Sequence, residues 1–254
     1  MKGELIVFEG ADCMFKETNS SLLCTYINSH YPEKQAKVVS FPRYGEPAAH
    51  FTETYLNKGY PRDIAPDAVS YFYLMDQFDY MSTEGDNLLE NGHTLILDRY
   101  WYSDLVYRTA SLLFSETPSQ RRKGYKTLES IASNAEKLLK NYAANLVYIM
   151  TTGQAGIPYG DELLKKLWSD HKEDINVSRT RYMLDVAKAY DSDIIIPYIT
   201  TREPAEICKI RIAYEAVDEL GRIDNVILHD RDVIADKVYE KYEEFCRKVD
   251  IFNY

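Results

Sequence analysis

The chain has 254 residues, of which 45% are hydrophobic and 28% charged, an ordinary balance for a soluble globular protein with a sizeable core. Its 30 basic and 40 acidic residues give a net charge of −10, which argues against a general nucleic-acid coat and against a membrane-surface protein. The four cysteines are scattered and no apolar run reaches the roughly 18 residues that span a bilayer, so we expect a cytoplasmic protein that binds neither membranes nor nucleic acid.

The first predicted element is a short buried strand over residues 4–9, followed by a tight turn at Gly10 and a helix that begins near Lys16. A strand that leads through a loop into a helix N-terminus is typical of a phosphate cradle, because free backbone N–H groups and the helix dipole both favour an anion there. Gly10 and Lys16 have the spacing of the P-loop pattern G-x-x-x-x-G-K-[ST]. Phe15 replaces its second glycine and Glu17 its hydroxyl residue, so the bare pattern fails.

The wider segment V-F-E-G-A-D-C-M-F-K-E-T, residues 7–18, resembles the start of thymidylate kinases, which read F-E-G-x-D-G-S-G-K-x-T. The resemblance implies that Lys16 holds the β- and γ-phosphates of ATP, with Gly10 and Thr18 beside the same nucleotide. It also implies that Asp12 orients the sugar of the acceptor nucleotide.

The loop departs from that family at Cys13, Met14 and Phe15. Glycines in such a loop let the backbone wrap the phosphates and reach positive φ, whereas β-carbons crowd the ligand. We therefore expect a degenerate loop, with Phe15 as its sharpest departure.

A second strand is predicted over residues 36–41, followed by the turn-rich loop F-P-R-Y-G-E-P. Loops at the carboxyl ends of parallel strands bind ligands in doubly wound proteins. The loop resembles the thymidylate kinase segment that carries an arginine near the acceptor phosphate. Arg43 is the candidate for that role and Phe41 for a substrate contact, and the alternative is a plain surface turn.

One long helix is predicted over residues 66–90, with Pro66 in its first turn. In thymidylate kinases the matching helix carries an aromatic ring that stacks on the base, and then an arginine one turn on. Tyr73 has the aromatic position and Gln77 the arginine position, which puts full recognition of dTMP in doubt. An aromatic stripe at helical spacing also fits a core role.

A buried strand over residues 93–98 ends in Asp98 and Arg99. A guanidinium at that edge suits phosphate, and a carboxylate suits Mg²⁺ or its waters. The sequence D-R-Y-x-x-S, which includes Ser103, matches thymidylate kinases closely. The resemblance implies that Asp98 positions Mg²⁺ and that Arg99 grips the acceptor phosphate, and the alternative is a structural ion pair.

A helix over residues 115–142 and a fourth strand over 145–150 precede the region 151–176, where the family has a mobile lid with arginines. Here that region contains no arginine. Arg179, on the following predicted helix, is a candidate for the donor phosphates, with a surface role as the alternative.

The remaining segments predict a fifth strand over residues 193–199 and amphipathic helices over 203–220 and 230–249. Strands that alternate with helices indicate an α/β fold, a doubly wound parallel five-stranded sheet flanked by helices. With no repeat or credible linker, we expect a single domain over residues 1–254.

Two functions stay open at this point. The first is a nucleoside monophosphate kinase that moves the ATP γ-phosphoryl to dTMP or a related pyrimidine nucleotide with Mg²⁺, at impaired activity. The second is a catalytically inactive pseudo-kinase that serves as a nucleotide-binding or scaffold module. A kinase with an altered acceptor is a third, weaker reading. The family resemblance also implies a homodimer.

Overall fold

A five-stranded parallel sheet, with strand order β2-β3-β1-β4-β5, forms the centre of the computed structural model. The structure describes residues 2–60, 64–153, 155–156, 158–170, 177–220 and 222–252. The strands are β1 (Glu4–Gly10), β2 (Lys37–Ser40), β3 (Thr94–Asp98), β4 (Leu146–Thr151) and β5 (Glu206–Arg211). The predicted α/β fold class with a parallel five-stranded sheet is confirmed.

The three central strands are buried along almost their whole length. Strands covered by helices on both faces are apolar continuously rather than alternately, which explains the run Leu5–Phe8 in β1 and Leu146–Met150 in β4. In the parallel register Phe8 pairs with Asp98, and Gly10 pairs with Met150. The ends of β1, β3 and β4 therefore meet at one edge of the sheet.

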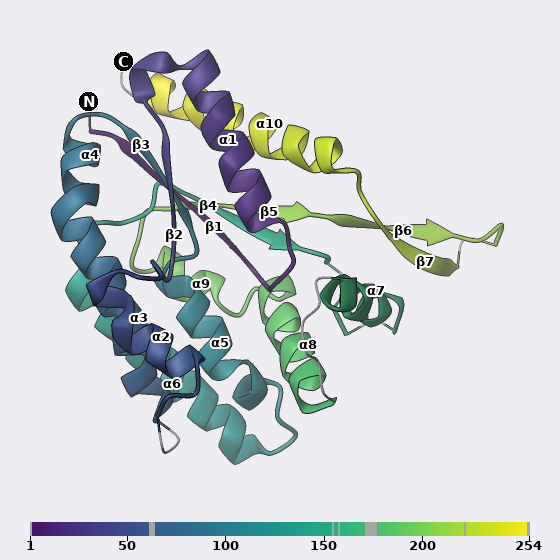
Figure 1. The fold of residues 1–254 in the computed structure, drawn as a ribbon. Coiled ribbons are helices and arrows are strands. Elements are labelled where there is room, and N and C mark those ends of the chain that lie inside the picture. Colours follow the sequence, from purple (N-terminus) through teal and green to yellow (C-terminus); the bar gives the residue numbers. More distant parts are fainter. Residues whose placement is uncertain are drawn as a thin grey trace.

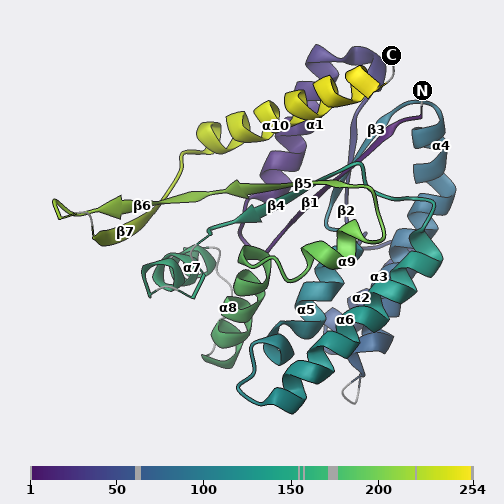
Figure 2. The ribbon, with the colours of Figure 1, turned by 180° about the vertical axis from the view of Figure 1, so that it is seen from behind.

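Helices cover both faces of the sheet (Figures 1 and 2). On one face lie α1 (Lys16–His30) and α10 (Arg231–Phe252), and on the other lie α5 (Trp101–Leu113) and α8 (Val177–Asp191). Outside α5 lie α3 (Pro66–Tyr80) and α6 (Pro118–Leu139). The remaining helices are η1 (Pro32–Lys34), η2 (Pro47–Ala49), α2 (His50–Leu56), α4 (Asp86–Glu90), α7 (Pro158–Asp170) and α9 (Ile196–Thr200).

The helix predicted over residues 66–90 is present as one helical run with a wide turn inside it. It consists of α3, the π-helical turn η3 (Met81–Gly85) and α4. Met81 and Gly85 are buried, and a Cβ added at Gly85 would lie 3.0 Å from the Met81 sulfur. The wide turn thus packs tightly where the helix passes β3.

Two predictions for the C-terminal third are wrong. Residues 193–199 are not a strand: the segment ends in the short helix α9, with Pro197 in its first turn. Proline cannot donate a ladder hydrogen bond, and Ile195 and Ile199 are buried four residues apart, as a helix requires. The fifth strand is instead Glu206–Arg211, inside the predicted helix 203–220, which is not formed.

The other half of that predicted helix forms an antiparallel ribbon, β6 (Ala213–Val217) with β7 (Ile223–Leu228). Apolar residues three or four apart, such as Ile207, Ile210 and Tyr214, imitate helical periodicity although they lie on successive strands. The ribbon projects away from the sheet beside α7 (Figure 1). Within the described residues, no helix is long and apolar enough to cross a membrane.

The predicted C-terminal helix over residues 230–249 is present as α10 and belongs to the core. Its Val238 and Tyr242 side chains are fully buried. The Tyr239 ring stacks on Tyr26 of α1 at a centroid distance of 4.4 Å, and Glu243 accepts a 2.7 Å hydrogen bond from the Tyr26 hydroxyl. This helix therefore completes one face of the sheet.

Candidate functional site

The loop between β1 and α1 keeps a glycine-like path despite its side chains. Gly10 has a φ of 148°, and a Cβ there would lie 2.5 Å from the Met150 carbonyl oxygen, so only glycine fits. Cys13 and Phe15, where the family has glycine, have φ values of 64° and 56°. The left-handed conformation costs a non-glycine residue about 1–2 kcal/mol, so the fold holds this loop against local preference.

Met14 does not obstruct the loop. Its side chain is 1% exposed and belongs to the hydrophobic core, whereas Phe15 is partly buried and packs at the core's margin. Of the three residues that differ from the family pattern, Cys13 and Phe15 therefore place side chains on the positive-φ positions of the loop. Met14 anchors the loop in the hydrophobic core.

A cavity of about 450 Å³ opens above this loop. It is lined by residues 12–18 together with Asp98 and Arg99, and so it includes the predicted Lys16 and Thr18. The Lys16 ammonium donates a 2.6 Å hydrogen bond to the Ala11 carbonyl. Burial, with the nearby charge of Arg99, lowers the pKa of Lys16 to about 8. The Lys16 side chain is thus held at the cavity, and its ammonium group loses its proton near pH 8.

Asp98 ends β3 at the same cavity. Its Oδ1 atom is buried and has no hydrogen-bond partner among the described residues. Burial raises the pKa of Asp98, opposed by the charge of Lys16. An orphaned carboxylate oxygen fits Mg²⁺, which is held by one or two carboxylates together with substrate phosphates.

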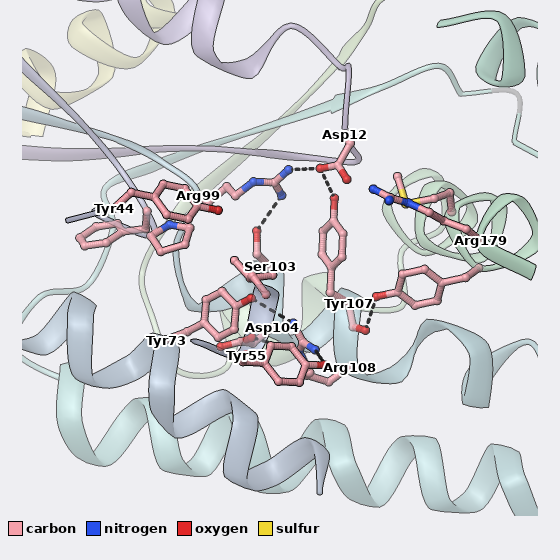
Figure 3. A pocket seen from close by; sticks show the side chains of 15 residues that line it. Asp12, Tyr44, Tyr55, Tyr73, Arg99, Ser103, Asp104, Tyr107, Arg108 and Arg179 are labelled. Carbon is pink, nitrogen blue, oxygen red and sulfur yellow. Dashed lines mark hydrogen bonds and ion pairs between the residues drawn. The ribbon is translucent and has the colours of Figure 1, made fainter. Parts of the chain in front are cut away.

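Arg99, with a φ of 72°, connects this cavity to a second, larger one. Its guanidinium pairs with the Asp12 carboxylate and lies 3.4 Å from the Ser103 hydroxyl (Figure 3). The Tyr107 hydroxyl donates to the same Asp12 oxygen at 2.8 Å. Although burial alone would raise it, the charges of Arg99 and Lys16 hold the pKa of Asp12 below its ordinary value. The structure therefore brings Asp12, Arg99 and Ser103 together, and their roles at a nucleotide stay predictions.

Glu9 supports this group from inside the sheet. The carboxylate is fully buried and accepts hydrogen bonds from the Tyr100 backbone N–H at 2.8 Å and from the Ser103 and Tyr190 hydroxyls at 2.7 Å. It thereby fixes the start of α5 against β1.

The larger cavity, of about 570 Å³, has aromatic walls. The predicted Phe41 and Tyr73 line it, together with Tyr55. The Arg108 guanidinium lies 5.2 Å from the ring centre of Tyr55 and 5.3 Å from that of Tyr73, and donates to the Tyr55 hydroxyl at 3.0 Å (Figure 3). A planar cation and two rings therefore form one end of this cavity.

Two predicted contacts do not line this cavity. Gln77 is 2% exposed, with its side-chain oxygen unpaired among the described residues. Arg43 forms ion pairs with Asp76 of α3 at 2.8 Å and with Asp79 of the same helix at 2.6 Å, and Asp76 is fully buried. A role for Arg43 at the acceptor phosphate stays a prediction.

Part of the predicted lid, residues 151–176, lies outside the described residues, including His171 and Lys172. Within the described part, α7 contacts the loop, because the buried Trp168 indole donates to the Asp12 carbonyl at 3.2 Å. Arg179, on α8, lines the larger cavity and not the loop cavity (Figure 3).

Comparisons with known proteins identify relatives of the fold. The structure of thymidylate kinase from Ehrlichia chaffeensis superposes with a TM-score of 0.58 at 13% identity, over 96% of this chain and 99% of that one. Thymidylate kinase from Candida albicans superposes with a TM-score of 0.53 at 22% identity, over 82% and 84%. The chain has the fold of the thymidylate kinases. The resemblance found in the sequence is thereby confirmed.

The sequence similarity to known proteins covers a smaller part of this chain than the structural similarity does. A curated thymidylate kinase from Plasmodium falciparum is 28% identical over 116 residues, 46% of this chain. The match spans 53% of that relative, about half its length. No protein-family model matches the chain.

Sequence reasoning missed several residues of this candidate site: Glu9, Tyr55, Asp104, Tyr107, Arg108 and Trp168. A signal existed for two of them. Asp104 directly follows the D-R-Y-x-x-S motif and Arg108 comes four residues later, so a helix beginning at that motif would present both on one face. Trp168 had no local signal, because its contact with Asp12 spans 156 residues.

Proposed function

We propose that this protein is a nucleoside monophosphate kinase that transfers the γ-phosphoryl group of ATP to dTMP or a related pyrimidine nucleotide. The observation that supports it is the pair of neighbouring cavities that share Asp12 and Arg99. Phosphoryl transfer needs a donor and an acceptor phosphate side by side, with positive charge between them. The loop cavity would take the donor phosphates, and the larger cavity would take the acceptor nucleotide.

The side chains have complementary roles in this proposal. Lys16 would hold the β- and γ-phosphates of ATP, and Arg99 would bind the acceptor phosphate beside Ser103. Asp12 would orient the acceptor sugar while keeping the Arg99 guanidinium in place. Asp98 would hold Mg²⁺ together with the donor phosphates, and the bound ion would supply positive charge beside the transferred group.

We expect transfer to be slow. The region 151–176 has no arginine, and a lysine is a point charge that replaces an arginine fork poorly. An arginine that stabilises the transferring group is worth about 10³–10⁵ in rate in related chemistry. Arg179 lies at the larger cavity, and a donor-phosphate role for it would require ATP to reach that side.

A second candidate is an inactive nucleotide-binding pseudo-kinase. The observation that favours it is the loop itself, where Cys13 and Phe15 carry side chains at positive φ beside the phosphate cavity. In that case the acceptor cavity would still bind its nucleotide, without transfer.

A thermal-shift titration with dTMP, dUMP, ADP and ATP-Mg, followed by an ADP-release assay, separates the candidates. A ligand at a hundred times its Kd stabilises the native state by about 2.7 kcal/mol. The kinase proposal expects stabilisation by both dTMP and ATP-Mg, with turnover that Lys16→Met abolishes. Binding of dTMP without any turnover, even in a single-turnover experiment, would favour the pseudo-kinase. If no nucleotide stabilises the protein, both candidate functions are contradicted.

We also propose that the 254 residues act as one cytoplasmic domain and associate as a homodimer. Tyr71 and Met75, four residues apart on α3, are 44% and 52% exposed and form an apolar strip. We expect light scattering to give twice the chain mass, and Met75→Glu to give a monomer, because a buried unpaired charge opposes association. A monomeric wild type would contradict the dimer.

A further inference from the structure

Tyr190 of α8 contacts the candidate site only through other side chains. It is 1% exposed, and its hydroxyl donates a 2.7 Å hydrogen bond to Glu9 Oε2 and lies 3.4 Å from the Ser103 hydroxyl oxygen. Neither Tyr190 nor Glu9 is among the described residues that line the two cavities. Any effect of Tyr190 on a bound nucleotide must therefore pass through its neighbours.

Hydrogen-bond donors surround the Glu9 carboxylate. The Ser103 and Tyr190 hydroxyls both donate to Oε2 at 2.7 Å, and the Tyr100 backbone N–H donates to Oε1 at 2.8 Å. Burial raises the pKa of Glu9, and these donors together with the charge of Arg99 oppose that rise. The donors thus favour the ionised form. An ionised carboxylate only accepts, so each hydroxyl must turn its single hydrogen toward Glu9.

The orientation of the Ser103 hydroxyl decides what it offers to Arg99. With its hydrogen on Glu9, the hydroxyl presents only oxygen lone pairs to other neighbours. Arg99 Nη1 donates to this oxygen at 3.4 Å and to the Gly10 carbonyl oxygen at the same distance (Figure 3). A guanidinium accepts no hydrogen bond, so a Ser103 hydroxyl that turned its hydrogen toward Arg99 would lose this contact. Glu9 thereby keeps Ser103 as an acceptor for Arg99.

A second tyrosine of α8 acts on Asp12, the ion-pair partner of Arg99. The Tyr182 hydroxyl donates to the Tyr107 carbonyl oxygen at 2.6 Å, and the Tyr107 hydroxyl donates to Asp12 at 2.8 Å. Tyr182 and Tyr190 are about two helical turns apart and so lie on the same face of α8. One face of this helix therefore supports both members of the pair.

Arg99 and Asp12 line both cavities, so the orientation of the pair matters to any phosphate bound there. Arginine binds phosphate through parallel N–H groups that lie in one plane, and a misoriented guanidinium loses them. We propose that Tyr190 is a positioning residue for the acceptor phosphate. Through Glu9 and Ser103, it holds the Arg99 guanidinium in the orientation that binds this phosphate. The inference rests on the proposed function and adds a residue of α8 to the acceptor site.

The test measures the affinities for dTMP and for thymidine by calorimetry. Thymidine lacks the phosphate group, so the ratio of the two affinities reports the contribution of the phosphate alone. The variant is Tyr190→Phe, which removes only the hydroxyl. The matched control is Tyr148→Phe, because the Tyr148 hydroxyl is also buried, donates to the Val238 carbonyl at 3.0 Å, and belongs to a residue that lines neither cavity.

We expect Tyr190→Phe to weaken dTMP binding by up to about tenfold, roughly the worth of one hydrogen bond, and to leave thymidine binding unchanged. In turnover, the KM for dTMP should rise while the KM for ATP-Mg stays constant. Tyr148→Phe should change neither affinity. Ser103→Ala should also weaken dTMP, and Tyr190→Phe added to it should cost little more, because both changes act on the same contact of Arg99.

The outcomes separate the inference from the proposed function. If Tyr190→Phe leaves dTMP binding unchanged, or weakens dTMP and thymidine alike, the positioning role is overturned, while phosphorylation of dTMP by the wild type still supports the kinase. Full additivity of Tyr190→Phe and Ser103→Ala would overturn the route through Ser103. If the wild type binds dTMP no more tightly than thymidine, no phosphate is held at Arg99, and both the inference and the acceptor assignment are overturned.

Discussion

At the residue scale, the loop after β1 shows how tertiary structure holds a conformation that its sequence disfavours. Cys13 and Phe15 adopt positive φ, while Met14 between them is anchored in the core. A variant that removes the Met14 side chain would therefore leave a cavity, and large-to-small core changes of this kind cost about 2–5 kcal/mol. Phe15 can be changed without that penalty.

We predict that Phe15→Gly is more stable than Phe15→Ala by about 1 kcal/mol, because both remove the ring but only alanine keeps a β-carbon in the left-handed region. Phe15→Gly should also bind ATP-Mg several-fold more tightly than the wild type if the ring crowds the cradle. Urea unfolding and calorimetry measure the two effects. Equal stability of the two variants would contradict the strained loop.

Lys16 leads to a pH prediction. Its pKa of about 8 in the folded protein lies below the ordinary 10.5, so its buried charge destabilises the fold below pH 8, and that cost fades as the pH rises toward 10.5. Bound phosphate favours the ammonium form, so ADP binding takes up a proton above pH 8.

The affinity for ADP should therefore fall by up to about tenfold per pH unit between pH 8 and 9.5. Calorimetry at several pH values measures this slope. Lys16→Met should bind weakly with no slope, whereas Lys165→Met, which changes an exposed lysine of α7, should keep it. A wild-type affinity independent of pH would contradict the assignment of Lys16 to the phosphates.

At the element scale, α5 and α7 connect the two cavities to the rest of the fold. α5 begins at the D-R-Y-x-x-S motif and carries Ser103 toward Arg99, Tyr107 toward Asp12, and Asp104 and Arg108 into the lining of the larger cavity. α7 reaches the loop through Trp168. A conformational change of the loop should therefore alter the surroundings of Trp168 on α7.

We predict that ATP-Mg binding changes tryptophan fluorescence through Trp168. The chain has two tryptophans, and Trp101 lies apart from the cavities, with its indole donating to the buried Glu203 at 2.9 Å. Trp168→Phe should abolish the ligand-induced change and cost about 1 kcal/mol for the lost hydrogen bond. Trp101→Phe should preserve the change. A response that disappears only in Trp101→Phe would contradict the contact between α7 and the loop.

At the scale of the whole molecule, α10 is part of the core rather than an appendage. The buried Tyr242 hydroxyl donates to Glu4 of β1 at 3.0 Å and accepts from Lys34 at 3.0 Å. The last helix thereby joins the first strand and the segment after α1. The two ends of the described chain lie side by side (Figure 1).

Tyr242→Ala should lower the free energy of unfolding by about 3–5 kcal/mol, since it empties a buried aromatic site and leaves Glu4 and Lys34 without this partner. Val233→Ala, at a position of α10 that is 40% exposed, should cost less than about 0.5 kcal/mol. Chemical denaturation compares the two. Similar small losses would mean that α10 is dispensable for the fold.

The sequence by itself determined the strand–loop–helix that begins the chain, the parallel sheet, and the placement of Asp12, Asp98, Arg99 and Ser103 at one edge. These follow from hydrophobic runs and from motifs that are local in the chain, and the carboxyl ends of parallel strands meet at the same edge.

Only the tertiary structure decided which charges face which cavity and which segment became the fifth strand. Arg43 forms ion pairs with Asp76 and Asp79 of α3. The cation beside the Tyr73 ring is Arg108, and not a side chain at position 77. The segment 206–211 is a strand because β4 supplies its hydrogen bonds, although its apolar spacing suits a helix. Such choices depend on partners far away in sequence, whose burial and charge outweigh local propensity.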